Sequence, residues 1–136
     1  MHDDPIPDAF ARFIGQLERA TGKAVSVHNP VIDLGDARLC LHWVQAEGMP
    51  SSVVFAFTLT AFEIQDAATL AHLLSLNRDM LGTCALPACF CLDESGHHVQ
   101  FQQRMLLEDM PIWALERYIH DTLERMRELF VIVVKP

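Results

Sequence analysis

The hydrophobic residues of this chain follow a helical spacing near its beginning. Apolar side chains recur on one side of residues 8–21, where Pro7 and Asp8 can start a helix and Gly22 can end it. The recurring positions are Phe10, Phe13, Ile14, Leu17 and Thr21. The pattern predicts a first helix over these residues.

After this helix the spacing changes to the alternation that is typical of strands with one buried face. Turns are expected at Asn29 and Pro30, at Gly35 and Asp36, and at residues 48–50. The alternating positions are Val25 and Val27 for a first strand, Leu39, Leu41 and Trp43 for a second, and Val53, Phe55, Phe57 and Leu59 for a third. Three consecutive strands are therefore predicted.

A second helix is predicted between Asp66, which can cap its first turn, and Gly82, which can end it. One side of this helix carries Leu70, Leu73, Leu74, Asn77 and Leu81. A hairpin follows, with its turn in the sequence DESG at residues 93–96. Phe90 and Leu92 share one face of the hairpin with Val99 and Phe101, while Cys89 and Cys91 share the other with His98, Gln100 and Gln102.

A long third helix can begin at Pro111. Its apolar stripe consists of Leu115, Tyr118, Ile119, Thr122, Met126, Leu129 and Phe130. The apolar residues Val131 to Val134 follow directly and are expected to pack on the core or on another subunit. The predicted order is α-β-β-β-α-β-β-α, an α+β protein with three helices and an antiparallel, twisted five-stranded sheet.

Composition limits the size, partners and location of the protein. A chain of 136 residues with 51% hydrophobic residues is expected to form a single domain, residues 1–136, with a sizeable core. A net charge of −8 without a basic cluster argues against nucleic acid as a partner. Because the chain has no apolar run of about 18 residues and no signal pattern, we expect a cytoplasmic protein that does not contact the membrane. Its four cysteines are then expected to be reduced.

The sequence CFC and a nearby histidine raise the question of a metal site. Cys89, Cys91 and His98 offer three of the four ligands that a structural zinc ion needs. Two ligands that lie two residues apart on a rigid strand converge poorly on one ion, and no fourth ligand is evident. We therefore expect no metal and no cofactor, with a zinc- or thiol-dependent small α+β protein as an alternative.

The sequence contains no G-x-S-x-G, no H-E-x-x-H and no Gly-rich loop leading from a strand into a helix. His42 is expected to be a half-buried sheet residue, and His72 and His120 are expected on solvated helix faces. The protein is therefore expected not to be an enzyme and to have no catalytic residues.

Apolar residues are more numerous than one copy of the chain can bury. The strand faces opposite the main apolar pattern also carry Cys40, Val44, Val54 and Ala56. Three helices cannot cover both faces of a five-stranded sheet in so short a chain. The surplus is expected to contact another chain, either in a homodimer or in a groove for an extended, unfolded polypeptide.

Four segments carry a family resemblance: LLSLN at residues 73–77, the strand ALPACFCLD, the turn DESG, and the strand HVQFQQRMLL. Together with the element order and the small acidic chain, they resemble class I type III secretion chaperones of the Tir-chaperone (CesT) type. The resemblance covers nearly the whole chain, and its motifs are structural rather than catalytic. The apolar tail after Phe130 departs from the family pattern, and the cysteine-rich strand is not a family hallmark.

The resemblance implies a bacterial, cytoplasmic, virulence-associated chaperone that is non-catalytic and independent of ATP. It implies a homodimer that binds the N-terminal chaperone-binding segment of a secreted effector in extended form and keeps it soluble and competent for secretion. The secretion-system ATPase is a further partner that the resemblance allows. A protein-binding module of the same fold with no role in secretion is a second alternative.

The resemblance also implies two surfaces. The dimer interface is expected at Leu73, Leu74, Asn77, Leu81, Cys89 and Cys91. The effector-binding candidates are Phe10, Phe13, Ile14, Leu17, Val25, Val27, Ile32, Leu39, Leu41 and Trp43. Because the first helix has a single apolar stripe, some of its residues must belong to the core instead.

Overall fold

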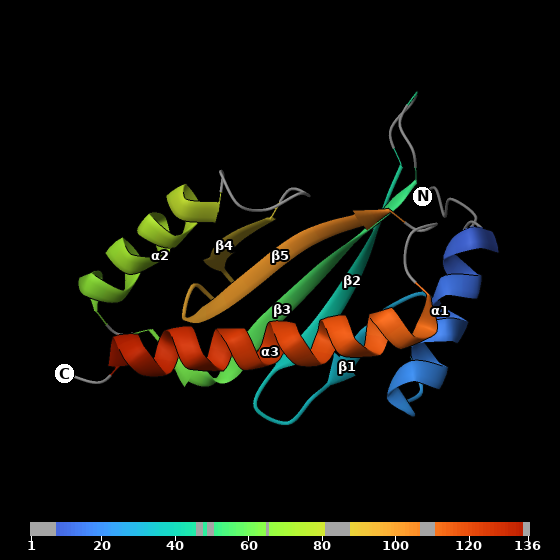
Figure 1. Ribbon diagram of the computed structural model, residues 1–136, viewed down its shortest axis with the longest axis horizontal. Coiled ribbons are helices and arrows are strands. Elements are labelled where there is room, and N and C mark those ends of the chain that lie inside the picture. Colours follow the sequence, from blue (N-terminus) through green and yellow to red (C-terminus); the bar gives the residue numbers. More distant parts are fainter. Residues whose placement is uncertain are drawn as a thin grey trace.

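The computed structural model describes residues 8–45, 48, 51–64, 66–80, 88–106 and 111–134. The elements are α1 (Asp8–Thr21), β1 (Val31–Asp33), β2 (Arg38–Val44), β3 (Ser52–Glu63), α2 (Ala67–Met80), β4 (Ala88–Leu92), β5 (His98–Leu106) and α3 (Ile112–Val134). The order predicted from the sequence is confirmed. The strands form one antiparallel sheet in the order β1-β2-β3-β5-β4, so that β1 and β4 are its edges (Figure 1).

The limits of α1 follow from local signals. Its apolar side chains are buried, and Gly22 ends the helix with a positive φ of 68°, which favours glycine. The Gly22 N–H donates a hydrogen bond of 2.8 Å to the Glu18 carbonyl. Helix α2 is capped as predicted, because Asp66 accepts hydrogen bonds from the backbone N–H and the hydroxyl of Thr69, at 2.8 and 2.7 Å.

The first strand lies later in the chain than predicted. Val25 and Val27 belong to no strand, and β1 begins at Val31. The turn between β1 and β2 brings Asp33 opposite Arg38, so the residues nearest to this turn are the ones that pair. Val25 is buried in the core without strand pairing, which explains why its hydrophobicity alone was misleading.

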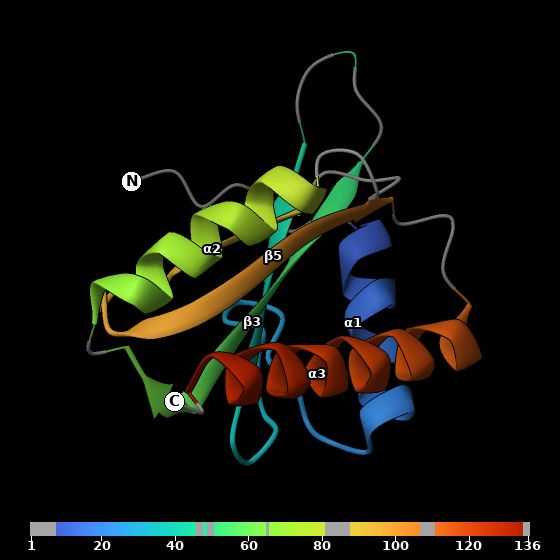
Figure 2. The same cartoon turned by 60° about the vertical axis from the view of Figure 1, so that its left-hand side comes forward.

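One face of the sheet is covered by two helices. The ring of Phe55 on β3 lies 5.8 Å from that of Phe13 on α1 and 5.3 Å from that of Tyr118 on α3. Both helices therefore pack on the same side of the strands, as Figure 2 shows. We call this side the covered face; it contains most of the large buried side chains.

Helix α2 lies beside the edge strand β4 rather than over the middle of the sheet (Figure 1). Asn77 accepts a hydrogen bond of 2.6 Å from the backbone N–H of Phe90 and donates one of 2.8 Å to its carbonyl. Phe90 lies beside Phe101 of β5, but its backbone N–H and C=O point away from β5. Both of these groups are bonded by the side-chain amide of Asn77. Asn77 thus takes the place of a neighbouring strand.

Helix α3 is longer than the apolar stripe predicted. The helix continues through Val131 to Val134, so these residues are not a separate tail after the helix. In its second half, Arg127 makes two hydrogen bonds of 2.7 Å to the carboxylate of Asp36 in the turn between β1 and β2. This bidentate pair ties α3 to the β1 edge of the sheet.

Candidate functional site

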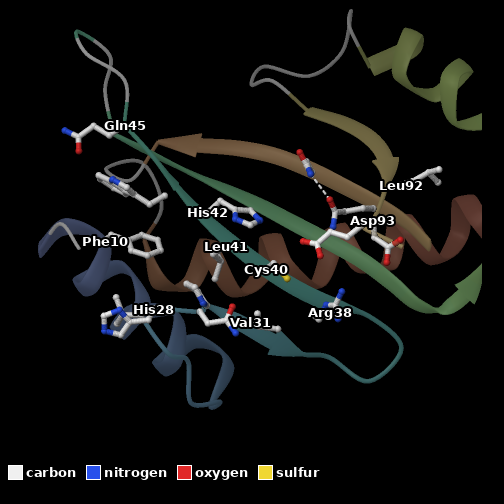
Figure 3. Close-up of a pocket in the computed structure, with 17 residues that line it drawn as sticks. Phe10, His28, Val31, Arg38, Cys40, Leu41, His42, Gln45, Leu92 and Asp93 are labelled. Atoms are coloured by element: carbon white, nitrogen blue, oxygen red, sulfur yellow. Dashed lines mark hydrogen bonds between the residues drawn. The ribbon is translucent and has the colours of Figure 1, made fainter. Parts of the chain in front are cut away.

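The other face of the sheet, which we call the open face, is hollowed. The hollow has a volume of about 1420 Å³ and extends from the region of β1 and β2 to the β4–β5 hairpin. In Figure 3 it is seen with α3 behind the strands, and with Arg38, Cys40 and His42 of β2 along its length. These three residues alternate with Leu39, Leu41 and Trp43, so the strand period itself separates the two faces.

The amide side chains of Gln100 and Gln102 form part of the floor of the hollow and are held by hydrogen bonds. The side-chain N–H of Gln102 donates a hydrogen bond of 2.6 Å to the side-chain oxygen of Gln100. The side-chain N–H of Gln100 donates one of 2.9 Å to the hydroxyl of Thr58. The thiol of Cys91 lies 3.6 Å from the same Gln100 oxygen. This chain of hydrogen bonds crosses from β4 through β5 to β3 and fixes the side chains of the floor.

Apolar side chains border the hollow at its two ends. At one end, Phe10 of α1 and Trp43 of β2 are in contact, with ring centroids 5.6 Å apart. At the other end, Leu92 of β4 is 38% exposed. An extended chain lying across the floor can therefore contact the aromatic pair at one end, the hairpin residues Leu92, Asp93 and Glu94 at the other, and polar side chains between them.

The hairpin turn beside Leu92 is held by one carboxylate. Asp93 accepts hydrogen bonds from the Ser95 hydroxyl at 2.8 Å and from the His98 backbone N–H at 3.2 Å, and its other oxygen lies 3.2 Å from the Nδ1 atom of His98. Burial acts to raise the pKa of Asp93, but these hydrogen bonds and the nearby His98 hold it below its usual value. The turn is thus a fixed border of the hollow.

The effector-binding candidates are mostly residues of the core in the single chain. All of them except Val27 and Trp43 are buried, although Phe10 and Leu41 also line the hollow together with these two. Contact with a bound segment stays a prediction for this set. The structure distinguishes four members that border the hollow from six that fill the covered face.

The predicted dimer residues of α2 fall on different sides of the helix. Leu73 is buried against the core and Asn77 is bonded to β4, whereas Leu74 is 71% exposed. Leu81 lies outside the described residues. Exposed apolar residues form a continuous outer stripe, which consists of Ala67, Leu70, Ala71 and Leu74. Leu73 and Leu74 therefore differ in exposure, and the predicted dimer interface stays a prediction.

The thiols lie on the predicted face of the hairpin. Cys89 is exposed and Cys91 is half-buried, opposite Gln102 and Gln100 respectively. Burial and the neighbouring Cys89 raise the pKa of Cys91 to about 11. Among the described residues, no group of three or more His, Cys, Asp and Glu side chains is arranged to hold a metal ion, so the zinc alternative gains no support there.

Two histidines differ from their predicted exposure. His42 is exposed in the hollow rather than half-buried, because it lies on the open face of β2, opposite the face that α1 and α3 cover. His72 is half-buried, and its Nε2 atom has no hydrogen-bond partner among the described residues. His120 lies exposed on α3, as predicted.

Sequence reasoning missed the polar floor and the role of Asn77. A signal for the latter was present, because a side-chain amide at an otherwise apolar helix position needs a partner when it is buried. The floor was harder to recognise, since Gln100 and Gln102 resemble ordinary solvent-facing strand residues until the strand order is known.

Comparisons with known proteins found no matching family model, curated protein or solved structure. In the parts of the chain that the structure describes, none of the helices combines the length and the hydrophobicity needed to cross a bilayer. The structure itself shows an α+β fold with a five-stranded antiparallel sheet, three helices and a hollow on the open face of the sheet.

Proposed function

We propose that this protein is a non-catalytic type III secretion chaperone that holds the N-terminal segment of a secreted effector in extended form. The observation that carries the proposal is the hollow on the open face, bordered by an aromatic pair at one end and by Leu92 at the other. The family resemblance of the sequence supplies the link to secretion, since a hollow of this kind also suits other extended polypeptides.

The energetics suit a complex that is stable but can be released. Each fully buried apolar side chain of the segment contributes about 1.5–3 kcal/mol, so four or five of them supply roughly 6–15 kcal/mol. Ordering the segment and losing its translational freedom subtract several kcal/mol from this sum. The remaining free energy corresponds to micromolar to nanomolar affinity, and neither ATP nor a covalent step is needed.

The outer stripe of α2 supports the homodimer in this proposal. An exposed row of Ala and Leu side chains on a helix of an otherwise acidic protein is suited to pack against a second copy. A dimer presents two hollows to one continuous segment, so the second docking step is intramolecular and strengthens binding.

Co-expression tests the binding of the segment. The full chain is produced together with the N-terminal regions of proteins encoded by neighbouring genes, and co-purification is measured. His42→Glu introduces a charge that a bound segment would bury, so it is expected to abolish co-purification. His120→Glu, on exposed α3, is the matched control and is expected to leave it unchanged.

Three outcomes are distinguishable in this experiment. Binding that depends on His42, to a protein that the cell secretes, supports the proposal. Binding of an equally extended segment from a protein that stays in the cell favours a protein-binding module without a role in secretion. If no neighbouring product binds, the proposal fails.

Light scattering of the purified protein tests the dimer. Leu74→Asp is expected to convert dimers to monomers, because it places a carboxylate in the outer stripe of α2. Trp113→Asp is the control, since Trp113 on α3 is also 71% exposed but lies outside this stripe. A monomeric wild type, or equal dissociation of both variants, would contradict the proposed interface.

A further inference from the structure

The proposed function assigns no chemistry to the cysteine pair of β4, which the family resemblance places in the dimer interface. Cys89 and Cys91 lie two residues apart on a paired strand, so their side chains leave the open face side by side. We propose that these two thiols form a binding site for a soft monovalent cation, Cu(I), held by two sulfur ligands.

Strand geometry excludes a disulfide between the two cysteines. Side chains at positions i and i+2 of a strand start about 6.6 Å apart at their Cβ atoms. A disulfide needs Cβ atoms about 3.5–4.5 Å apart, so closing one would pull the backbone of β4 away from β5. The pair therefore stays a dithiol as long as the strand is paired.

The spacing converges poorly on a tetrahedral zinc ion, but it suits a linear arrangement in which the ion lies between the two sulfur atoms. A metal–sulfur bond is about 2.3 Å long, so a linear S–metal–S arrangement spans about 4.6 Å. Each sulfur atom then has to lean about 1 Å towards the other from Cβ atoms about 6.6 Å apart, which a change of side-chain rotamer achieves. The backbone of β4 keeps its hydrogen bonds.

The number of ligands selects the metal. Structural zinc requires four ligands, whereas Cys89 and Cys91 supply two sulfur atoms. His98, which the sequence analysis considered as a third ligand, lies against Asp93 in the hairpin turn. Thiolates prefer soft cations such as Cu(I), which is stable with two sulfur ligands.

Binding exchanges protons for the metal ion. Both thiols lose their protons to water, and the cation with two thiolates carries one net negative charge.

An anaerobic titration tests the site. The reduced full-length protein is mixed with Cu(I) bound to a coloured chelator, and transfer of the ion is followed by loss of the chelator colour. We expect one Cu(I) per chain, with transfer abolished by Cys89→Ser and by Cys91→Ser. Cys40→Ser is expected to leave transfer unchanged, although Cys40 lies on the same open face.

A second variant keeps the number of cysteines constant. In the double variant Cys91→Ser with Leu92→Cys, the second thiol moves to the opposite face of β4. It is expected to bind no Cu(I), which separates the proposed site from general thiol binding. Gln100→Glu is expected to weaken binding about tenfold, because it places a carboxylate beside the anionic complex.

Transfer by this double variant, or equal loss of transfer in Cys40→Ser, would overturn the proposal. So would stoichiometric Zn(II) binding that competes equally with Cu(I). Circular dichroism of each variant confirms that the sheet is intact. None of these results depends on whether a secreted effector binds.

Discussion

The two faces of the sheet are built from the same strands but differ in what they bury. On the covered face, Phe55 and Phe57 are almost fully buried between α1 and α3. On the open face, the adjacent residues are smaller or polar, and the side chains of Val54 and Gln102 remain partly exposed. The packing that stabilises the fold therefore lies on the covered face, while the hollow lies on the open face of the same strands.

This division has a physical cause. Side chains that contact α1 and α3 are densely packed, so a change in their volume disturbs the packing of the surrounding core. On the open face Ala56 and Thr58 are buried, but Val54 and Gln102 are partly exposed to solvent, so substitution of these two leaves a smaller void and alters the surface instead. Four predictions test this contrast, beginning with the largest expected effect.

Phe55→Ala is expected to lower the free energy of unfolding by about 3–5 kcal/mol, because it removes a ring that contacts Phe13, Phe57 and Tyr118. Urea denaturation measures the change. Val54→Ala, one position along on the open face, is the matched control, with an expected loss of about 1 kcal/mol or less. Equal losses for the two variants would show that the faces do not differ as described.

Asn77→Ala is expected to lower the free energy of unfolding by about 1–3 kcal/mol, because the backbone of Phe90 loses both of its hydrogen bonds to Asn77. Hydrogen exchange should show faster exchange of the Phe90 amide in particular. Ser75→Ala, exposed on the same helix, is expected to change stability by less than about 0.5 kcal/mol. Unchanged exchange at Phe90 would argue against the pairing.

Alkylation compares two thiols on the open face. Cys91 is expected to react with iodoacetamide at pH 8 at least about tenfold more slowly than exposed Cys89. The reason is that burial and the neighbouring thiol raise the pKa of Cys91 to about 11, so little reactive thiolate is present. Peptide mass spectrometry over time measures both rates, and equal rates would contradict the burial of Cys91.

The ion pair of Asp36 and Arg127 is expected to have the smallest effect. The hydrogen bond from Arg127 holds the pKa of Asp36 below its ordinary value, so the stabilisation is present above about pH 3.9 and is lost as the pH falls through the lower, folded-state pKa. Both side chains are 42% exposed, which limits the contribution to about 1 kcal/mol or less.

Denaturation of Asp36→Asn at pH 7 and at acidic pH measures this contribution. The difference from the wild type should be present at pH 7 and should shrink in acid. Arg125→Gln, exposed on the same helix, is the control and is expected to show no such pH dependence. A stability difference between Asp36→Asn and the wild type that grows on acidification would contradict a stabilising ion pair.

Local signals in the sequence predicted most of the elements. The limits of α1 follow from Asp8 and Gly22, and the faces of the β4–β5 hairpin follow from simple alternation. Where prediction failed, the missing information was a contact distant in the sequence. Val25 resembled a strand residue. However, the β1–β2 turn pairs β2 with Val31–Asp33, which lie nearer to the turn, so Val25 has no strand partner.

The candidate site was less predictable than the fold. The resemblance pointed to apolar residues of α1 and β2, and burial in the covered face accounts for most of them. The hollow depends on which strands are neighbours, and its two ends come from segments far apart in the chain, near Phe10 and near Leu92. No periodicity along the sequence records such a distance.

The sequence by itself determined the types of element, their order, and which side chains of each strand share a face, because these follow from periodicity, caps and turns. Only the tertiary structure decided which face the helices cover, where Asn77 finds its partner, and where the surface is hollowed. These features depend on packing between elements that are distant in the sequence, and such packing is a property of the whole assembled sheet.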